Sequence, residues 1–244
     1  MLRKGDLTQG GIITTLLQFT LPMLAGSLLQ QCYNIADTLI VGQCIGANAL
    51  AAVGSAYTLM VFLISILLGL SIGSGTVFSL QYGAGDLSAL RRSIYVSLLL
   101  IGTVTILLNV AVFLWLDPIL RWLQVPYDIY SLMRNYLWII FWGIVFTFLY
   151  NFYAALLRAV GDSVTPLWFL AVSVVLNIGL DLFLILVLDQ GIEGAAVATV
   201  IAQGTAASGI LLYTYKTRPE LRLHREDMCF DRSSLREITS FSTL

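Results

Sequence analysis

The chain has 244 residues, of which 58% are hydrophobic and only 11% are charged, and its mean hydropathy is +0.88. A soluble globular domain carries about 25% charged residues, so this composition excludes an ordinary soluble domain and indicates a protein that crosses a membrane several times. The net charge of −1, without a basic patch, gives no reason to expect a nucleic-acid partner.

Six apolar stretches are long enough to cross a bilayer as helices, which takes about 20 residues each. Turn-forming and charged residues separate them, and none shows the ten-residue alternation of a membrane β-barrel. We therefore predict an all-α integral membrane protein, with a six-transmembrane-helix bundle in a domain of residues 1–215. The predicted spans cover approximately residues 12–40, 48–80, 92–115, 130–155, 164–187 and 192–214.

The two ends of the chain differ in character. The start, MLRKGDLTQGG, has no short apolar core followed by a small-residue cleavage site, so we expect no removable signal peptide. Residues 216–244 are basic and then resemble the approach to another amphipathic or membrane segment. We expect this region to be a cytoplasmic linker in a larger protein, although a natural tail is the alternative.

Basic residues are distributed unequally between the two sides of a six-span bundle. Only Arg121 and Arg134 fall on one side, and the other eleven of the 13 basic residues fall on the opposite side. Because cytoplasmic loops carry the excess of Lys and Arg, we place both termini in the cytoplasm. The eleven residues are Arg3, Lys4, Arg91, Arg92, Arg158, Lys216, Arg218, Arg222, Arg225, Arg232 and Arg236.

Two acidic residues, Asp37 and Asp181, lie well inside predicted spans. Ionisable residues at membrane depth are costly and usually face a cavity or a partner. Neither aspartate has a Lys or Arg within its own span, so no local ion pair is available. Two interpretations remain open, which are a protonated, hydrogen-bonded structural aspartate and a site for an ion or a proton.

Polar neighbours of the two aspartates recur at helical spacing. Residues four apart share one face of a helix, so three spans each present oxygen ligands on one stripe. Such oxygens suit a small hard cation, and equally a proton carrier, because burial favours the protonated carboxyl. Spacing alone does not bring the three stripes together. The stripes are Tyr33, Asn34 and Asp37 in the first span, Asn177 and Asp181 in the fifth, and Thr199 and Gln203 in the sixth.

Pro22 falls inside the first predicted span. Proline removes one backbone hydrogen bond of a helix and clashes with the preceding turn. A static kink is one interpretation. The other is a bend point near the polar stripe, since broken helices often mark transporter pathways.

The motifs of several other protein classes are missing. The cysteines Cys32, Cys44 and Cys229 form no metal-binding or redox spacing, and the single histidine, His224, lies in the tail. No Ser-His-Asp set and no phosphate-binding glycine loop of the GxxxxGK[ST] type is present. We therefore expect a protein that is not an enzyme and that has no cofactor.

Five stretches resemble the N-terminal half of a multidrug and toxic compound extrusion (MATE) transporter, and they occur in the family's order and spacing. The resemblance covers nearly all of residues 8–240. The stretches are LPMLAGSLLQQCYNIADTLIVGQCIGANALAAVG, GAGD, LRAVGDSVTPLW, LNIGLDLFLI and GIEGAAVATVIAQ.

The resemblance implies one six-helix lobe of a twelve-helix antiporter in a bacterial or archaeal plasma (inner) membrane. Such proteins export cationic or amphipathic compounds in exchange for Na+ or H+. The resemblance implies no cofactor besides this coupling ion. The family's cation-site pattern matches Asp37, Asn177, Asp181 and Thr199, the Na+ ligands if coupling uses sodium. Further polar cavity positions of the family match Tyr33, Tyr136 and Asn151.

The resemblance also leaves alternatives open, because the chain ends where the family's seventh helix should begin. A missing second lobe, or a homodimer, would have to supply the other cavity wall. The first alternative function is a lipid-linked oligosaccharide flippase of the same superfamily, although no Lys or Arg is expected deep inside a span. The second is a non-transporting half-molecule that dimerises or modulates a partner. The lipid bilayer is a partner in every case.

Overall fold

The computed structural model describes residues 12–224, 227 and 232–242, and every regular element in this part of the chain is a helix. Arg3, Lys4, Arg225 and Cys229, which entered the sequence analysis, lie outside the described residues. The α-helices are α1 (Ile12–Cys44), α2 (Ala47–Gly83), α3 (Leu87–Trp122), α4 (Tyr127–Trp142), α5 (Ile144–Ala159), α6 (Val164–Leu182), α7 (Gly191–Thr217) and α8 (Arg232–Ser242), with a π-helix η1 (Phe183–Val187) and a 3-10 helix η2 (Pro219–Leu221).

Long apolar helices correspond to the predicted spans. Among the described residues, α2, α3, α6 with η1, and α7 are long and apolar enough to cross a membrane, and α4 with α5 makes a fifth span if the bent pair is counted as one. Helix α1 has 33 residues, which is ample length, but it is not among the spans found within the described residues. That α1 is a sixth span stays a prediction.

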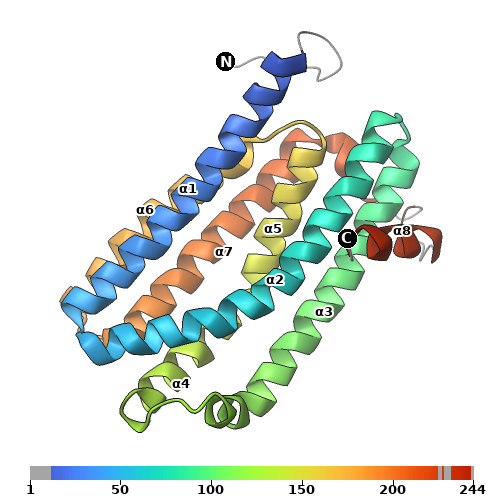
Figure 1. Ribbon diagram of the computed structural model, residues 1–244. Coiled ribbons are helices and arrows are strands. Elements are labelled where there is room, and N and C mark those ends of the chain that lie inside the picture. Colours follow the sequence, from blue (N-terminus) through green and yellow to red (C-terminus); the bar gives the residue numbers. More distant parts are fainter. Residues whose placement is uncertain (1–11, 225–226, 228–231, 243–244) are drawn as a thin grey trace.

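Successive long helices run in opposite directions, because only short turns connect them. In Figure 1, α1 lies along α6 with α7 beside them, while α2, α5 and α3 form the other side of the bundle. The turns after α2 and α5 and the segment after α7 therefore share one end of the bundle. The turns after α1, α3 and α6 share the other end, which is the arrangement that the predicted topology requires.

Gly–Asp pairs shape two turns at the first of these ends. Gly85 and Gly161 have φ of 74° and 86°, a left-handed conformation that side chains disfavour. Each is followed by an aspartate that accepts a backbone N–H of the next helix. Asp86 Oδ1 accepts from Ala89 at 2.9 Å and Asp162 Oδ1 accepts from Thr165 at 3.0 Å. In the GAGD stretch and in the AVGD part of LRAVGDSVTPLW, the aspartate therefore caps the start of the next helix.

The buried core lies between α2, α3, α4, α5 and α7. Phe78 and Phe152 meet edge to face with ring centroids 5.9 Å apart, and Phe141 is also almost fully buried. The outer surface of the helices is apolar too, as Leu114 and Val175 show with exposed fractions of 69% and 73%. An apolar exterior fits contact with lipid, where helices associate through close packing.

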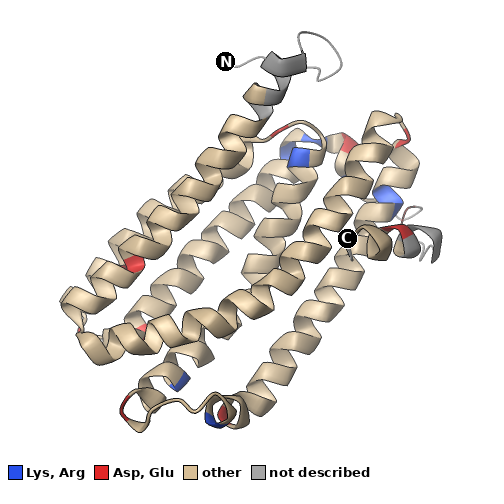
Figure 2. Ribbon diagram, in the orientation of Figure 1, with Lys and Arg blue, Asp and Glu red and all other residues tan. Residues whose placement is uncertain are grey.

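Charged residues gather near the two ends of the bundle (Figure 2). At the end that carries the Gly–Asp turns, Arg91 Nε donates to Asp227 Oδ2 at 2.9 Å, and Arg218 lies 3.6 Å from Asp162. These ion pairs hold the segment after α7 against the start of α3 and the α5–α6 turn. Ile238 of α8 then packs on α2 and α3. Whether this segment is an inter-lobe linker stays a prediction.

The fourth predicted span, residues 130–155, is not one straight helix. It divides into α4 and α5 at Gly143, where the two helices are bent by 46°. The Gly143 N–H donates to the Ile140 carbonyl oxygen at 2.8 Å. This hydrogen bond spans three residues, whereas those of a regular α-helix span four. Asn109 Nδ2 of α3 donates to the Phe141 carbonyl at 2.7 Å. A side chain of a neighbouring helix therefore supplies a hydrogen bond at the break.

Gly143 is required at this break, because a Cβ there would lie 2.9 Å from Val200 Cγ2 and 3.0 Å from the Ile140 carbonyl oxygen. We expect Gly143→Ala to lower the free energy of unfolding by about 1–3 kcal/mol, the usual cost of overpacking. Thermal unfolding of the detergent-solubilised protein measures the effect. The control is Gly102→Ala, whose Cβ would meet only the Phe148 ring at 3.8 Å. Equal melting temperatures for the two variants would contradict this account.

Candidate functional site

The two intramembrane aspartates face each other across the contact between α1 and α6. Asp37 of α1 is 8% exposed and Asp181 of α6 is fully buried, and the two carboxyl groups lie close enough for the charge of one to act on the other. Asn177, one turn before Asp181, and Thr199 of α7 are buried beside them. The structure thus brings together the four residues that the resemblance assigned to a cation site.

Thr199 joins the three helices through its hydroxyl oxygen. Oγ1 accepts from the Tyr33 hydroxyl at 3.2 Å and from Asn177 Nδ2 at 3.3 Å. Tyr33 comes from α1 and Asn177 from α6, so one atom of α7 lies between both. Because the amide nitrogen of Asn177 is used in this bond, its Oδ1 is free to bind another group.

Four buried oxygens in this cluster have no hydrogen-bond donor among the described residues. They are Asp37 Oδ1, Asn177 Oδ1, and both carboxylate oxygens of Asp181. Buried polar atoms are nearly always paired, so a convergent unpaired set marks a place for a proton or a cation. Carboxylate, amide and hydroxyl oxygens are hard ligands, and within the described residues no group of three or more His, Cys, Asp or Glu offers a transition-metal site. The residues present therefore fit a small hard cation.

A cavity of about 1340 Å3 borders this cluster. Asp37, Tyr33 and Thr199 line it, whereas Asn177 and Asp181 lie behind them and do not. A ligand that comes from the cavity would therefore meet Asp37 first. Tyr136 and Asn151, the other cavity positions that the resemblance implies, also line the cavity. So do Asn34 and Gln203 of the polar stripes, and Pro22, which was predicted as a bend point.

These other residues do not all join the four-residue cluster. Tyr136 of α4 is buried near Asp37, Tyr33 and Asp181. Asn34 Nδ2 instead donates to Gln31 Oε1 at 3.2 Å, so its amide nitrogen bonds within α1. Pro22 lies inside an α1 that continues from Ile12 to Cys44.

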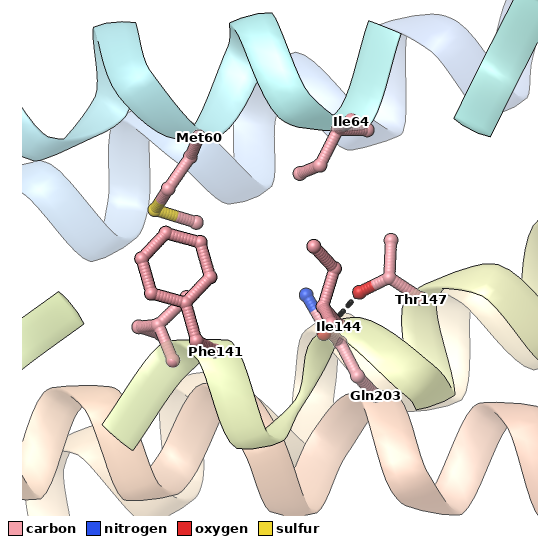
Figure 3. A pocket seen from close by; sticks show the side chains of 7 residues that line it. Met60, Ile64, Phe141, Ile144, Thr147 and Gln203 are labelled. Carbon is pink, nitrogen blue, oxygen red and sulfur yellow. Dashed lines mark hydrogen bonds between the residues drawn. The ribbon is translucent and has the colours of Figure 1, made fainter. Parts of the chain in front are cut away.

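Asn151 and Gln203 are held by one residue that the sequence analysis did not single out, Thr147 of α5. The Thr147 carbonyl accepts from Asn151 Nδ2 at 2.8 Å, and its hydroxyl donates to Gln203 Oε1 at 2.6 Å (Figure 3). Thr147 and Asn151 are four residues apart, the same spacing that identified the other stripes. That spacing was the available signal, and it was not used for this pair.

Arg158 is a second residue that the sequence analysis placed differently. It was expected in a connection, but the structure places it in the last turn of α5, where it lines the cavity. It has no ion-pair partner within the described part of the chain. A basic side chain therefore borders a cavity in which only acidic ones were expected.

Comparison with known proteins places this geometry in a family. The sequence profile of the MatE family matches residues 22–183. The chain is 37% identical over 211 residues to "Probable multidrug resistance protein YpnP" of Bacillus subtilis (strain 168), covering 86% of this chain and 47% of that protein. It is 31% identical over 213 residues to "Multidrug export protein MepA" of Staphylococcus aureus (strain NCTC 8325 / PS 47), covering 84% and 46%.

The fold agrees with these sequence matches. A crystal structure of a MATE protein in the bent conformation superposes with a TM-score of 0.91 at 23% identity, covering all of this chain and 54% of the other. The chain spans about half the length of the curated relatives it matches. With the profile match over residues 22–183, these relatives show that the chain belongs to the MatE family of multidrug efflux transporters.

Proposed function

We propose that this chain is one lobe of a secondary antiporter that exports cationic or amphipathic compounds in exchange for Na+ or H+. The coupling site consists of Asp37, Asn177, Asp181 and Thr199. The observation that carries this proposal is the set of unpaired buried oxygens beside the cavity wall. Their arrangement leaves a negative, partly dehydrated site that a cation or a proton stabilises.

The position of Asp37 gives the site a route to the cavity. Asp37 lines the cavity and lies near Asp181 behind it, so one carboxylate faces both a cationic substrate and the buried oxygens. A bound ion and a substrate cation then compete for the same negative charge. Competition of this kind is what exchange requires, because each ligand must favour a different state of the protein.

Binding at this site acts on α1. A cation between Asp37 and Asp181 draws α1 toward α6, and Pro22, which lacks a backbone N–H, lets α1 bend between its start and the site. In a membrane potential of 100 mV, moving one elementary charge across the membrane corresponds to about 2.3 kcal/mol. That energy is enough to bias a switch between two conformations of α1.

The proposed setting follows from the charge distribution and from the family. Both termini lie in the cytoplasm and the bundle lies in a bacterial or archaeal plasma membrane. A second lobe, or a second copy of this chain, completes the cavity wall. The absence of a further cofactor is part of the proposal, since the coupling ion supplies the driving force.

Arg158 favours a second candidate function. A guanidinium beside the cavity, with no acidic partner among the described residues, suits a phosphate group. Transport of an anionic lipid-linked substrate would use such a group. Substitutions that remove a charge distinguish the two candidates. Drug export would be lost on substitution of Asp37 or Asp181, and lipid transport would be lost on substitution of Arg158.

Cation binding tests the site directly. We expect Asp37→Asn and Asp181→Asn each to lower Na+ affinity at pH 8 by tenfold or more, which is about 1.4 kcal/mol, because each removes a charged ligand. Isothermal titration of the purified chain in nanodiscs gives the affinity. If protons are the coupling ion, Na+ does not bind, and the same variants instead abolish proton uptake by the site. Asp128→Asn, at the exposed start of α4, is the control. Unchanged ion and proton binding in both site variants would refute the assignment.

Transport tests the function. In proteoliposomes, a complete transporter that contains this lobe is expected to move ethidium when a Na+ gradient or a pH gradient is imposed separately. Asp181→Asn should reduce coupled transport at least tenfold while the amount of reconstituted protein stays the same, because the buried carboxylate can no longer change its charge. Arg158→Gln should leave ethidium transport within twofold of the unmodified protein. A large loss of transport in Arg158→Gln, with little change in Asp181→Asn, would favour the lipid-linked substrate.

A further inference from the structure

Thr147 fixes the orientation of the Gln203 side chain. Its hydroxyl lies 2.6 Å from Gln203 Oε1 and 3.4 Å from the Gly143 carbonyl, so the bond to Gln203 is much the shorter. The hydroxyl has one hydrogen to donate, and the amide oxygen is an acceptor. The oxygen of Gln203 is therefore directed toward α5, and its amide nitrogen is directed elsewhere.

The amide nitrogen of Gln203 is available to a ligand. It has no hydrogen-bond partner among the described residues, and it is not one of their buried atoms without a partner. Gln203 lines both the large cavity and a small pocket that adjoins it. Figure 3 shows the nitrogen pointing toward the space between α5 and the side chains of Met60 and Ile64.

The surroundings of this nitrogen are apolar. Met60 and Ile64 of α2, Phe141 of α4 and Ile144 of α5 line the small pocket, and Thr147 and Gln203 are its only hydrogen-bonding side chains among the described residues. A hydrogen bond formed in such an environment is stronger than one in water, and a donor left unpaired there is costly. The small pocket itself, with a volume of about 10 Å3, has room for no more than a water molecule. A substrate would therefore meet the oriented donor from the large cavity, where Met60 and Ile64, which line both spaces, can contact its aromatic or aliphatic body.

The donor lies close to the proposed coupling site. Gln203 and Thr199 are four residues apart on α7, so they share one face and are separated by about 6 Å along the helix axis. A substrate whose cationic centre lies near Asp37 can therefore extend along α7 and place a second group beside Gln203. That second group must accept a hydrogen bond, because the amide nitrogen is a donor.

We propose that Gln203, positioned by Thr147, is a specificity-determining residue that donates a hydrogen bond to a neutral carbonyl group on an aromatic cationic substrate. This inference rests on the proposed export function and names the substrate class of the same cavity. Thr147 acts through Gln203 and is a positioning residue. A site with an oriented donor discriminates against analogues without an acceptor, since the donor then stays unpaired.

The experiment compares two hydrophobic cations. Rhodamine 6G carries an ester carbonyl, and tetraphenylphosphonium has no hydrogen-bond acceptor. Binding to the full chain in nanodiscs is measured by fluorescence polarisation for the first and by equilibrium dialysis of radiolabelled compound for the second. We expect Gln203→Leu to weaken rhodamine 6G binding about five- to tenfold, consistent with the loss of one hydrogen bond, and to change tetraphenylphosphonium binding by less than twofold.

Variants of Thr147 separate positioning from packing. Thr147→Val keeps the shape of the side chain but removes the hydroxyl, and it should weaken rhodamine 6G binding selectively. Thr147→Ser keeps the hydroxyl and should restore it. Gln43→Leu is the matched control, because Gln43 is an exposed glutamine of α1 outside the cavity lining.

The outcomes distinguish this inference from the function on which it rests. Selective loss of rhodamine 6G binding in Gln203→Leu and Thr147→Val supports it. Equal loss of both probes, or no loss of either, overturns it and leaves the cavity as a site for cations in general. If the unmodified chain binds neither probe, the proposed export function fails together with the inference.

Discussion

Two carboxyl groups placed side by side in the interior, without a basic partner, are the constraint on which this structure depends. Asp37 and Asp181 lie close enough for the charge of one to act on the other, and the groups around them are hydroxyls and amides. Two like charges in a medium of low dielectric repel each other strongly. Tyr33 and Asn177 do not relieve this repulsion, because both donate to Thr199 instead. In the proposed function, a cation or a proton from the cavity beside Asp37 supplies the compensating charge.

The helix that carries Asp37 contributes little to the main buried core of the bundle. Among the described side chains, α1 contributes only Val41 to the buried core, whereas α2, α3, α4 and α5 each contribute several. Val41 lies one turn beyond Asp37, near the end of the helix. The remainder of α1 packs on α6 and borders the cavity. In the proposed mechanism, a change in charge at Asp37 moves α1 without disrupting the aromatic core between the other helices.

The sequence allowed much of this arrangement to be predicted, because helical spacing is a local property. Asn177 and Asp181 share a face for that reason, and so do Tyr33 and Asp37. The meeting of three helices at Thr199 is not local, and the family resemblance supplied it. The break at Gly143 was missed because the reason for a glycine there, the closeness of Val200 of a distant helix, is not a local property. Asn109 was missed for a similar reason, since its partner is the Phe141 carbonyl of another helix. The four-residue spacing of Thr147 and Asn151, in contrast, was a local signal that was not used.

Helix α7 contributes a residue to both polar sites, Thr199 to the site around Asp37 and Gln203 to the site around Thr147. Its buried face is rich in alanine, including Ala195, Ala198 and Ala202, so its neighbours approach closely and fix its position. Thr199 and Gln203 project from this fixed helix toward α1 and α5, the two helices that carry Asp37 and Thr147. The proposed coupling site therefore joins α7, which packs closely on its neighbours, to α1, which contributes little to the main core. Under the two proposals, the amide of Gln203 would stay with α7, so a substrate bound to it would keep its place while the charge at Asp37 changes. A change in α1 would then alter the access of substrate to the cavity, whereas the hydrogen bond to Gln203 would decide which substrate is held there.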